Sequence, residues 1–140
     1  MIVLDTNVIS EMTKPLPSSA VTAWLDTQPI DTMFITAVTV AEQGFGIALL
    51  PQGKRRQALE GALASTIALF AGRILPFDEQ AAMAYASLAA AAKVAGRGFP
   101  TPDGYIAAIA SARGFAVATR DAAPFHAGQL QVINPWEYAA

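Results

Sequence analysis

A chain of 140 residues with 54% apolar and 14% charged residues is long enough to bury a core and too hydrophobic to be a disordered polypeptide. Its net charge of −2 lacks the basic excess typical of proteins that bind nucleic acid by their own charge alone. The absence of cysteine excludes a disulfide framework, and no apolar run reaches the ~18 residues that span a bilayer. Without a basic leader, repeat or linker, we expect one cytoplasmic domain over residues 1–140, with no membrane association.

The first half of the chain predicts two strands, each followed by helix. The apolar "IVL" before Asp5 predicts a strand, and residues 6–14 predict a short helix that "PLP" stops. A helix capped by serine is expected over residues 18–28, followed by a strand at "MFIT". Residues 39–50 again carry apolar side chains at helical spacing.

The second half predicts longer helices and two further strands. In chain order, we expect a helix over 54–72, an extended segment over 73–77, helices over 78–96 and 101–114, a strand over 115–119, a loop over 120–128 and a strand over 130–136. Strands that alternate with helices indicate an α/β sandwich with a central, mostly parallel sheet flanked by helices.

In such sheets, ligands bind beyond the carboxyl ends of the strands. Asp5 follows the first strand, and Asp121 follows "FAVAT", so both acids should lie at the same rim. Each also has a purely structural interpretation, because Asp5 could accept backbone N–H bonds at a helix start and Asp121 could stabilise a turn.

Two further acids begin helices. Glu42 completes the capping-box pattern "TVAE", in which it would fold back to the helix start, although it would also face the rim. Asp103 follows "TP", where Thr101 would be the N-cap and the helix dipole favours a carboxylate. Gly104 is less expected inside a helix and indicates close approach of another group.

Four carboxylates at one rim would repel one another and raise one another's pKa values. A hard divalent cation with oxygen ligands, Mg²⁺ or Mn²⁺, removes this repulsion. We therefore predict a metal site that joins Asp5 and Asp103, with Glu42 and Asp121 holding its waters or a second ion. Glu11 could support the same rim or be solvated.

The stretches "LDTNVISE", "TVAEQGFGIALLPQGKRR", "TPDGYIAAIASARGFAVATRD" and "VINPW" occur in an order and spacing that resemble a known family. This family is the PIN-domain ribonucleases and, within it, the VapC-type toxins of bacterial type II toxin–antitoxin pairs. The resemblance covers essentially the whole chain. It implies a PIN-like three-layer sandwich and an acidic, Mg²⁺-dependent site that cuts RNA internally, leaving 5′-phosphate and 3′-hydroxyl ends.

By position, Asp5, Glu42 and Asp103 match the family's acids. Polar residues that support such sites match Thr6, Asn7 and Thr119. The resemblance also implies an antitoxin that blocks the site, a homodimer, and contact with DNA only through the antitoxin.

The chain departs from the family pattern at "TRDAAPF". Asp121 stands where the family commonly has asparagine, and Pro124 stands where it has its last aspartate. Either Asp121 replaces the missing acid or the site uses three acids.

The basic cluster Lys54, Arg55 and Arg56 is either a solvated helix start or a contact for the RNA backbone or a partner, and Arg120 is a further candidate contact. His126, the only histidine, is assigned no role.

Two other functions remain open. An aspartyl-phosphate phosphatase would also use Asp5 and Mg²⁺. That chemistry normally needs a second acid two residues later, where this chain has Asn7, and a lysine near the site, for which Lys93 is poorly placed. A catalytically degenerate PIN-like interaction module is conceivable because of Pro124.

Overall fold

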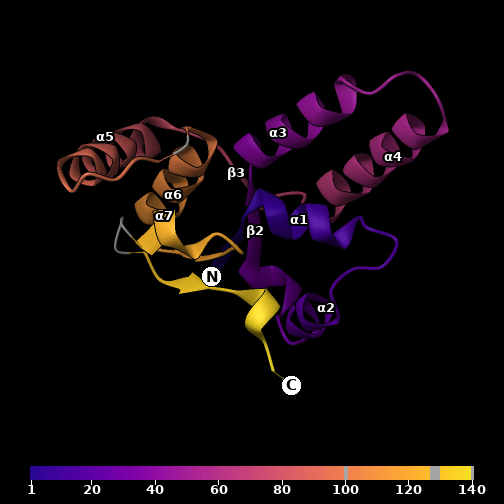
Figure 1. The fold of residues 1–140 in the computed structure, drawn as a ribbon, viewed down its shortest axis with the longest axis horizontal. Coiled ribbons are helices and arrows are strands. Elements are labelled where there is room, and N and C mark those ends of the chain that lie inside the picture. Colours follow the sequence, from indigo (N-terminus) through magenta and orange to yellow (C-terminus); the bar gives the residue numbers. More distant parts are fainter. Residues whose placement is uncertain (100, 127–129, 140) are drawn as a thin grey trace.

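The computed structural model describes residues 1–99, 101–126 and 130–139. Its strands form one parallel sheet between two layers of helices (Figure 1). The strand order is β3-β2-β1-β4-β5, so the chain starts in the centre, fills one side and then crosses to the other. The strands are β1 (Ile2–Leu4), β2 (Met33–Thr36), β3 (Ile74–Leu75), β4 (Ala116–Ala118) and β5 (Val132–Ile133).

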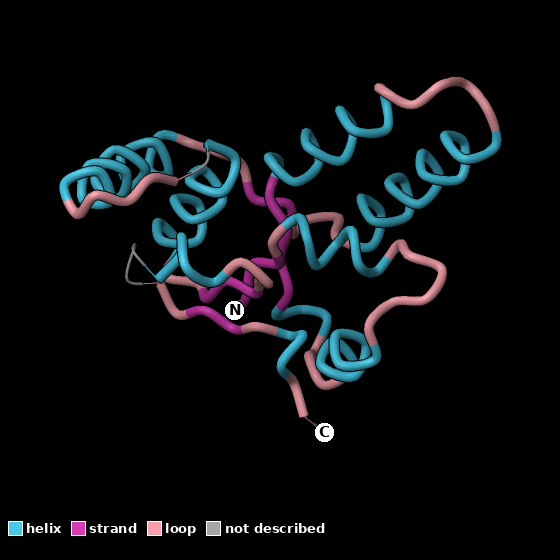
Figure 2. The backbone as a smooth tube through the Cα atoms, in the orientation of Figure 1, coloured by secondary structure: helices cyan, strands magenta, loops and turns pink. Residues whose placement is uncertain are grey.

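The helices surround the sheet, as the cyan and magenta segments of Figure 2 show. They are α1 (Thr6–Met12), α2 (Ser19–Asp26), α3 (Ala37–Ala48), α4 (Lys54–Leu69), α5 (Glu79–Val94), α6 (Thr101–Arg113) and α7 (Ala122–His126), with short 3-10 helices η1 (Ile30–Thr32) and η2 (Pro135–Glu137). Within the described ranges, no helix is long and apolar enough to cross a membrane.

Alternation along the strands builds a core on each face of the sheet. Val3 and Val117 belong to the apolar cluster that α5, α6 and α7 cover. Their neighbours Leu4 and Ala118 point the other way and pack with residues of α1 and α2. The expected sandwich is confirmed, and the sheet is entirely parallel rather than mostly so.

Several predicted helix ends are confirmed by their caps. Ser18 accepts a hydrogen bond from the Val21 N–H, and Asp78 accepts one from the Ala81 N–H. Gly114 follows α6 with φ of +69°, a conformation that favours glycine at a helix end.

Other boundaries were predicted wrongly. The capping box at "TVAE" is wrong, because Thr36 is the N-cap of α3 and its hydroxyl accepts from the Thr39 N–H at 3.1 Å. Thr101 is already helical rather than the N-cap; residue 100 lies outside the described residues.

The predicted loop over 120–128 contains α7, and its residues 127–128 also lie outside the described part. The predicted strand over 130–136 pairs at Val132–Ile133 and then turns into η2. The segment is short because Asn134 caps η2, accepting from the Trp136 N–H at 3.0 Å.

Helices α3 and α4 lie side by side and extend away from α5 and α6 (Figure 1). None of the residues of α4 is buried, and only Phe70, directly after it, enters the core. Phe45 and Leu49 of this hairpin region are 67% and 69% exposed. In the single chain, α4 also leaves Ile67 and Leu69 exposed, by 38% and 48%.

Candidate functional site

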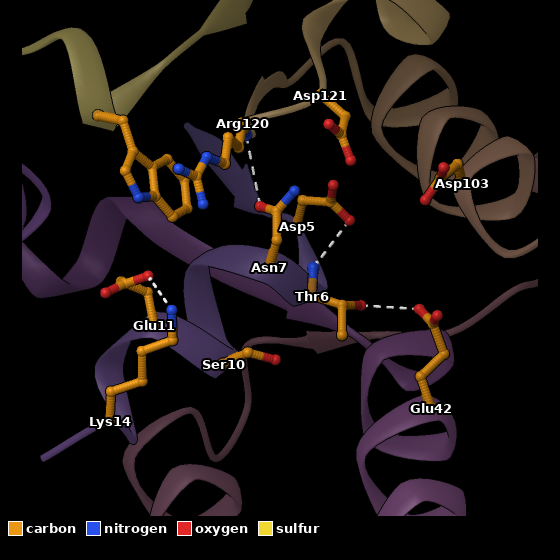
Figure 3. Close-up of a pocket in the computed structure, with 11 residues that line it drawn as sticks. Asp5, Thr6, Asn7, Ser10, Glu11, Lys14, Glu42, Asp103, Arg120 and Asp121 are labelled. Atoms are coloured by element: carbon orange, nitrogen blue, oxygen red, sulfur yellow. Dashed lines mark hydrogen bonds and ion pairs between the residues drawn. The ribbon is translucent and has the colours of Figure 1, made fainter. Parts of the chain in front are cut away.

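A pocket opens at the carboxyl end of the sheet, beside β1 and β4, where the strand order reverses. All four acids predicted for the site line it, and each comes from a different segment. Figure 3 shows Asp5 in the middle, with Asp121, Asp103 and Glu42 around it. The structure thus brings together side chains that are far apart in the sequence: Asp5, Glu42, Asp103 and Asp121.

Asp5 is the deepest of these acids, with 3% of its surface exposed. It is the N-cap of α1, and its Oδ1 accepts a hydrogen bond of 2.7 Å from the Thr6 N–H. Its own N–H donates to the Ala118 carbonyl, which extends the pairing of β1 with β4 by one residue. The predicted capping role of Asp5 and its place in the pocket therefore coexist.

Thr119 is fully buried below the pocket and fixes three of its groups. Its hydroxyl donates to Asp5 Oδ2 at 2.7 Å. The same oxygen accepts from Asn7 Nδ2 at 3.2 Å and from the Asp121 N–H at 3.1 Å. Asn7 and Thr119, which the sequence predicts as supporting residues, thus form a hydrogen-bonded chain to Asp5.

The side chain of Glu42, in α3, is hydrogen-bonded to a residue of α1 rather than to the start of its own helix. The Thr6 hydroxyl donates to Glu42 Oε1 at 2.7 Å. Because that uses the only hydroxyl proton of Thr6, the contact of 3.0 Å between Thr6 and Thr39 has Thr39 as the donor. Thr39, which is 1% exposed, was not predicted as a supporting residue.

Asp103 enters the pocket from the first turn of α6 (Figure 3). The neighbouring Gly104 confirms the expected close approach, because a Cβ there would lie 2.9 Å from the ring of Tyr85 in α5 and 3.2 Å from Phe99. The small residue lets α5 pack tightly against the turn that carries Asp103.

Asp121 and Pro124 have separate surroundings. Asp121 lines the acidic pocket, whereas Pro124 lines a different hollow with Arg97, Gly98 and Ala123. Asp121, the acid nearest in sequence to the position of the family's last aspartate, is therefore placed among the other carboxylates.

Burial and the nearby acids disfavour the ionised forms of two carboxyl groups in the pocket, Asp5 and Asp103. Burial raises the pKa of Asp5, with further upward contributions from Glu42 and Asp121, while hydrogen bonds from Thr119 and Thr6 act in the opposite direction. Burial, followed by the charges of Asp5, Glu42 and Asp121, raises the pKa of Asp103 to about 6. A cation would relieve this repulsion.

The donor set fits Mg²⁺ better than a softer metal, because it consists of carboxylate oxygens. In the residues that the structure describes, no three His, Cys, Asp or Glu side chains are close enough together to form a ready-made metal cluster. Mg²⁺ commonly uses only one or two carboxylates and keeps several waters, so a wide ring of acids suits it.

The opposite end of the pocket is cationic. Arg120 and Lys14 line it together with Glu11 (Figure 3). Glu11 is buried and accepts from Lys14 Nζ at 2.9 Å and from the Ser18 N–H at 2.9 Å. The bond from Lys14, then that from Ser18, lowers the pKa of Glu11. Glu11 therefore supports the rim, the first of its two predicted interpretations.

The basic cluster is elsewhere. None of Lys54, Arg55 and Arg56 lines the acidic pocket, since they begin α4 at the far end of the α3–α4 hairpin. Arg56 pairs with Glu60 at 2.8 Å and donates to the Leu50 carbonyl, so it stabilises the start of its own helix. His126, in α7, does not line the pocket either.

Ser10, Lys14 and Trp136 line the pocket but were not predicted. The spacing of Asn7, Ser10, Glu11 and Lys14 along one helical face is a signal that could have identified two of them. Trp136 lies in η2, near the end of the chain, and no sequence pattern links it to the first strand.

Comparison with known proteins agrees with this geometry. The PIN domain family matches residues 2–128. The chain is 54% identical to VapC ribonuclease Y4jK of Sinorhizobium fredii over 140 residues, which cover 99% of this chain and 100% of the relative. It is 48% identical to Toxin FitB of Neisseria gonorrhoeae over 137 residues, covering 97% of this chain and 99% of that protein.

A solved structure of FitAB bound to a DNA fragment superposes with a TM-score of 0.93 at 46% identity, covering 100% of this chain and 99% of that chain. The sheet order, the acidic pocket and these similarities have one explanation. The chain belongs to the PIN-domain family, among its VapC-type members.

Proposed function

We propose that the protein is a divalent-metal-dependent endoribonuclease that acts as the toxin of a toxin–antitoxin pair. The observation that carries the proposal is the convergence of four carboxylates in one pocket that raises the pKa of Asp103 to about 6. Such a site is stable at neutral pH when positive charge enters it. The relative named VapC ribonuclease supports RNA as the substrate.

The residues of the pocket would have different roles in binding the metal ion. Asp5 and Asp103 would hold Mg²⁺, with Mn²⁺ as a substitute, and Glu42 and Asp121 would hold its waters or a second ion. Bound there, the ion supplies positive charge to the phosphoryl oxygens and acidifies a water. Thr6 and Thr119 orient the carboxylates through the hydrogen bonds to Glu42 and Asp5.

The reaction is hydrolysis of the bond between phosphorus and the 3′-oxygen. The water oxygen bonds to phosphorus, the 3′-oxygen leaves and takes up a proton, and the products carry a 5′-phosphate and a 3′-hydroxyl. Nothing in this scheme uses the 2′-hydroxyl of RNA, so a 2′,3′-cyclic phosphate product would contradict it.

Arg120 lines the pocket and is the better placed of the predicted RNA contacts. The cluster Lys54, Arg55 and Arg56, at the tip of the α3–α4 hairpin, would contact a more distant part of the RNA or a partner. Charge reversal there should change the salt dependence of RNA binding if the cluster touches phosphates.

We also propose a cytoplasmic homodimer and a cognate antitoxin as partners, with DNA bound only through the antitoxin. The uncovered apolar side chains of the α3–α4 hairpin, including Phe45 and Leu49, support protein partners. The solved FitAB complex bound to a DNA fragment supports the antitoxin and its link to DNA.

The test is RNA cleavage by the purified chain with and without Mg²⁺, followed by analysis of the RNA ends. The wild type should cut in Mg²⁺, Asp5→Asn and Asp103→Asn should not, and Arg113→Gln, a change at the end of α6 outside the pocket, should cut normally. Asp121→Asn tests whether Asp121 replaces the family's last aspartate, whose position is occupied by Pro124 in this chain.

Equal cleavage by all variants would indicate a contaminating nuclease, and no cleavage by any would favour the degenerate interaction module. A phosphorylated Asp5 would revive the phosphatase, although Asn7 Nδ2 donates to Thr119 at the position where that chemistry needs an acid.

A further inference from the structure

The cationic end of the pocket contains an arginine stacked on an aromatic ring. The Arg120 guanidinium carbon lies 5.1 Å from the centre of the Trp136 ring, and both residues line the pocket. Arginine over tryptophan is a favourable cation–π arrangement, and it holds a long side chain in one place. Arg120 lies across Asp5 from Asp103 and Glu42, as Figure 3 shows.

The backbone ties this pair to the acidic end. The Arg120 N–H donates to Asn7 Oδ1 at 3.4 Å, while Asn7 Nδ2 donates to Thr119, which in turn donates to Asp5. The backbone of Trp136 is fixed from the other side, because the Asn134 side chain accepts a hydrogen bond from the Trp136 backbone N–H at 3.0 Å. The stacked pair is therefore held at a set position relative to the carboxylates.

The Arg120 side chain has unused hydrogen-bonding capacity. Among the described residues, its guanidinium makes no hydrogen bond and forms no ion pair within 4.0 Å. Lys14, the other cation at this end, is paired with Glu11 at 2.9 Å. A guanidinium has five N–H donors in a planar fork that matches a phosphate group.

We propose that Arg120 and Trp136 bind the nucleotide next to the scissile phosphodiester, with the guanidinium on its phosphate and its base stacked against the Arg120–Trp136 pair. The inference rests on the proposed ribonuclease function and identifies how the same pocket holds its substrate. A single-stranded nucleic acid offers both groups that this end can bind, a phosphate for the fork and an aromatic base for the stack. The phosphodiester that is cut then lies next to this nucleotide, at the acidic end of the pocket, where the acids would hold the divalent ion.

The test uses short single-stranded RNA oligomers, either intact or with one base removed at each position in turn. Binding is measured in the Asp103→Asn chain with Mg²⁺, so that the RNA stays uncut, and is compared among added changes at Arg120 and Trp136. Arg113→Gln, which removes an arginine outside the pocket, is the matched control.

Arg120→Gln should weaken binding about 10-fold and reduce the magnitude of the salt slope by about 0.7, the value for one phosphate of a single strand. Arg113→Gln should change neither. Trp136→Leu should weaken binding of intact RNA about 5- to 150-fold, the range for one lost base stack, while one of the abasic oligomers binds equally to both chains. Trp136→Phe should retain most of the affinity.

Tryptophan fluorescence gives an independent readout that does not depend on Trp136→Leu folding. The chain has two tryptophans, and Trp24 is buried in the core and does not line the pocket. RNA should therefore quench the emission of the Asp103→Asn chain and leave that of the same chain with Trp136→Phe nearly unchanged.

The proposal is overturned if Trp136→Leu weakens the binding of intact RNA and of every abasic RNA equally. It is also overturned if Arg120→Gln leaves the salt slope of binding unchanged, or if RNA still quenches the emission of the chain with Trp136→Phe. Failure of the ribonuclease proposal looks different, because the wild type would then leave RNA uncut while these binding differences remained.

Discussion

The hydroxyl of Thr119 donates a hydrogen bond of 2.7 Å to the carboxylate of Asp5, 114 positions earlier in the chain. Asp5 belongs to the loop after β1 and Thr119 to the loop after β4, so this bond joins the two strands at the point where the sheet order reverses. It also opposes the effect of burial, since it lowers the pKa of a carboxyl group that burial raises.

We expect Thr119→Val, which keeps the shape and removes the hydroxyl, to lower the free energy of unfolding at pH 8 by about 1.5–3 kcal/mol, the range for a hydrogen bond to a charged group. The loss should shrink at pH 4, where Asp5 takes up a proton. Urea unfolding at both pH values measures it. Thr119→Ser keeps the donor and should stay nearer the wild type; a loss for serine as large as that for valine would show that the methyl group contributes as much as the hydroxyl.

The raised pKa of Asp103 predicts how stability depends on pH. Its value of about 6 in the folded chain exceeds the ordinary aspartate pKa of 3.8, so the folded state binds more protons between these values and stability falls as pH rises through that window. Asp103→Asn should remove this fall and stabilise the metal-free chain at pH 7.5. Because Asp103 is partly exposed, we expect a gain on the order of 1 kcal/mol after allowance for solvent screening.

Thermal unfolding from pH 4 to pH 7.5 without metal measures this effect. Asp31→Asn changes an exposed aspartate outside the pocket and should leave the pH profile unchanged. A profile for Asp103→Asn that parallels the wild type would show that neither burial nor the other acids raise the pKa of Asp103.

Divalent metal should reverse this instability. A ligand that binds only the folded state adds about 2.7 kcal/mol at 100 times its dissociation constant, so Mg²⁺ should raise Tm and do so more at pH 7.5 than at pH 5. Removal of metal by EDTA should restore the lower Tm. The increase should disappear in Asp5→Asn and Asp103→Asn and persist in Asp31→Asn, and a similar increase with NaCl at matched ionic strength would indicate screening rather than binding.

The hydroxyl of Thr6 should matter through Glu42. Thr6→Val removes the donor to Glu42 Oε1 and leaves the carboxylate intact, so we expect a 10- to 100-fold loss of Mg²⁺ affinity, about the effect of losing an outer-shell partner. Calorimetric titration with Mg²⁺ measures the affinity without relying on cleavage. Thr6→Ser keeps the hydroxyl and should bind like the wild type; weak binding by both would assign the effect to side-chain packing.

Two glycines allow a matched test of the packing behind Asp103. A Cβ at Gly104 would meet the Tyr85 ring at 2.9 Å, whereas a Cβ at Gly61 in α4 would meet nothing within 4 Å. Gly61→Ala should stabilise the chain by about 0.5–1 kcal/mol through helix propensity. Gly104→Ala should instead destabilise it by about 1 kcal/mol, because overpacking of about 1–3 kcal/mol exceeds that gain. Urea unfolding of both variants decides; stabilisation of both would mean that Tyr85 moves freely.

Much of the fold and of the acidic pocket could be predicted, because the local sequence patterns agree with the way parallel strands and helices assemble. Asp5 and Asp121 each follow a run of strand-forming residues, and the carboxyl ends of parallel strands meet at one edge. The caps at Ser18 and Asp78 and the end of α6 at Gly114 depend on neighbouring residues alone, so a single sequence contains the information.

The remaining details depend on contacts between distant segments. Thr36 and Thr39 lie three residues apart and both suit a helix start, and only the end of β2 at Thr36 decides between them. The partner of Glu42 is Thr6 on another helix, which no local capping pattern can indicate. Trp136 reaches the pocket only because β5 adds to the edge of the sheet beside β4.

The order of the strands also has a consequence for protein synthesis. β1 is made first and β4 more than a hundred residues later, yet these two strands are neighbours and the pocket lies beside them. In a nascent chain that has not yet released β4 from the ribosome, Asp5 lacks its hydrogen bond from Thr119, and Asp121 is not yet beside it. Under the proposed function, the chain would therefore be unable to cut RNA near the ribosome that makes it until β4 has also been made and released.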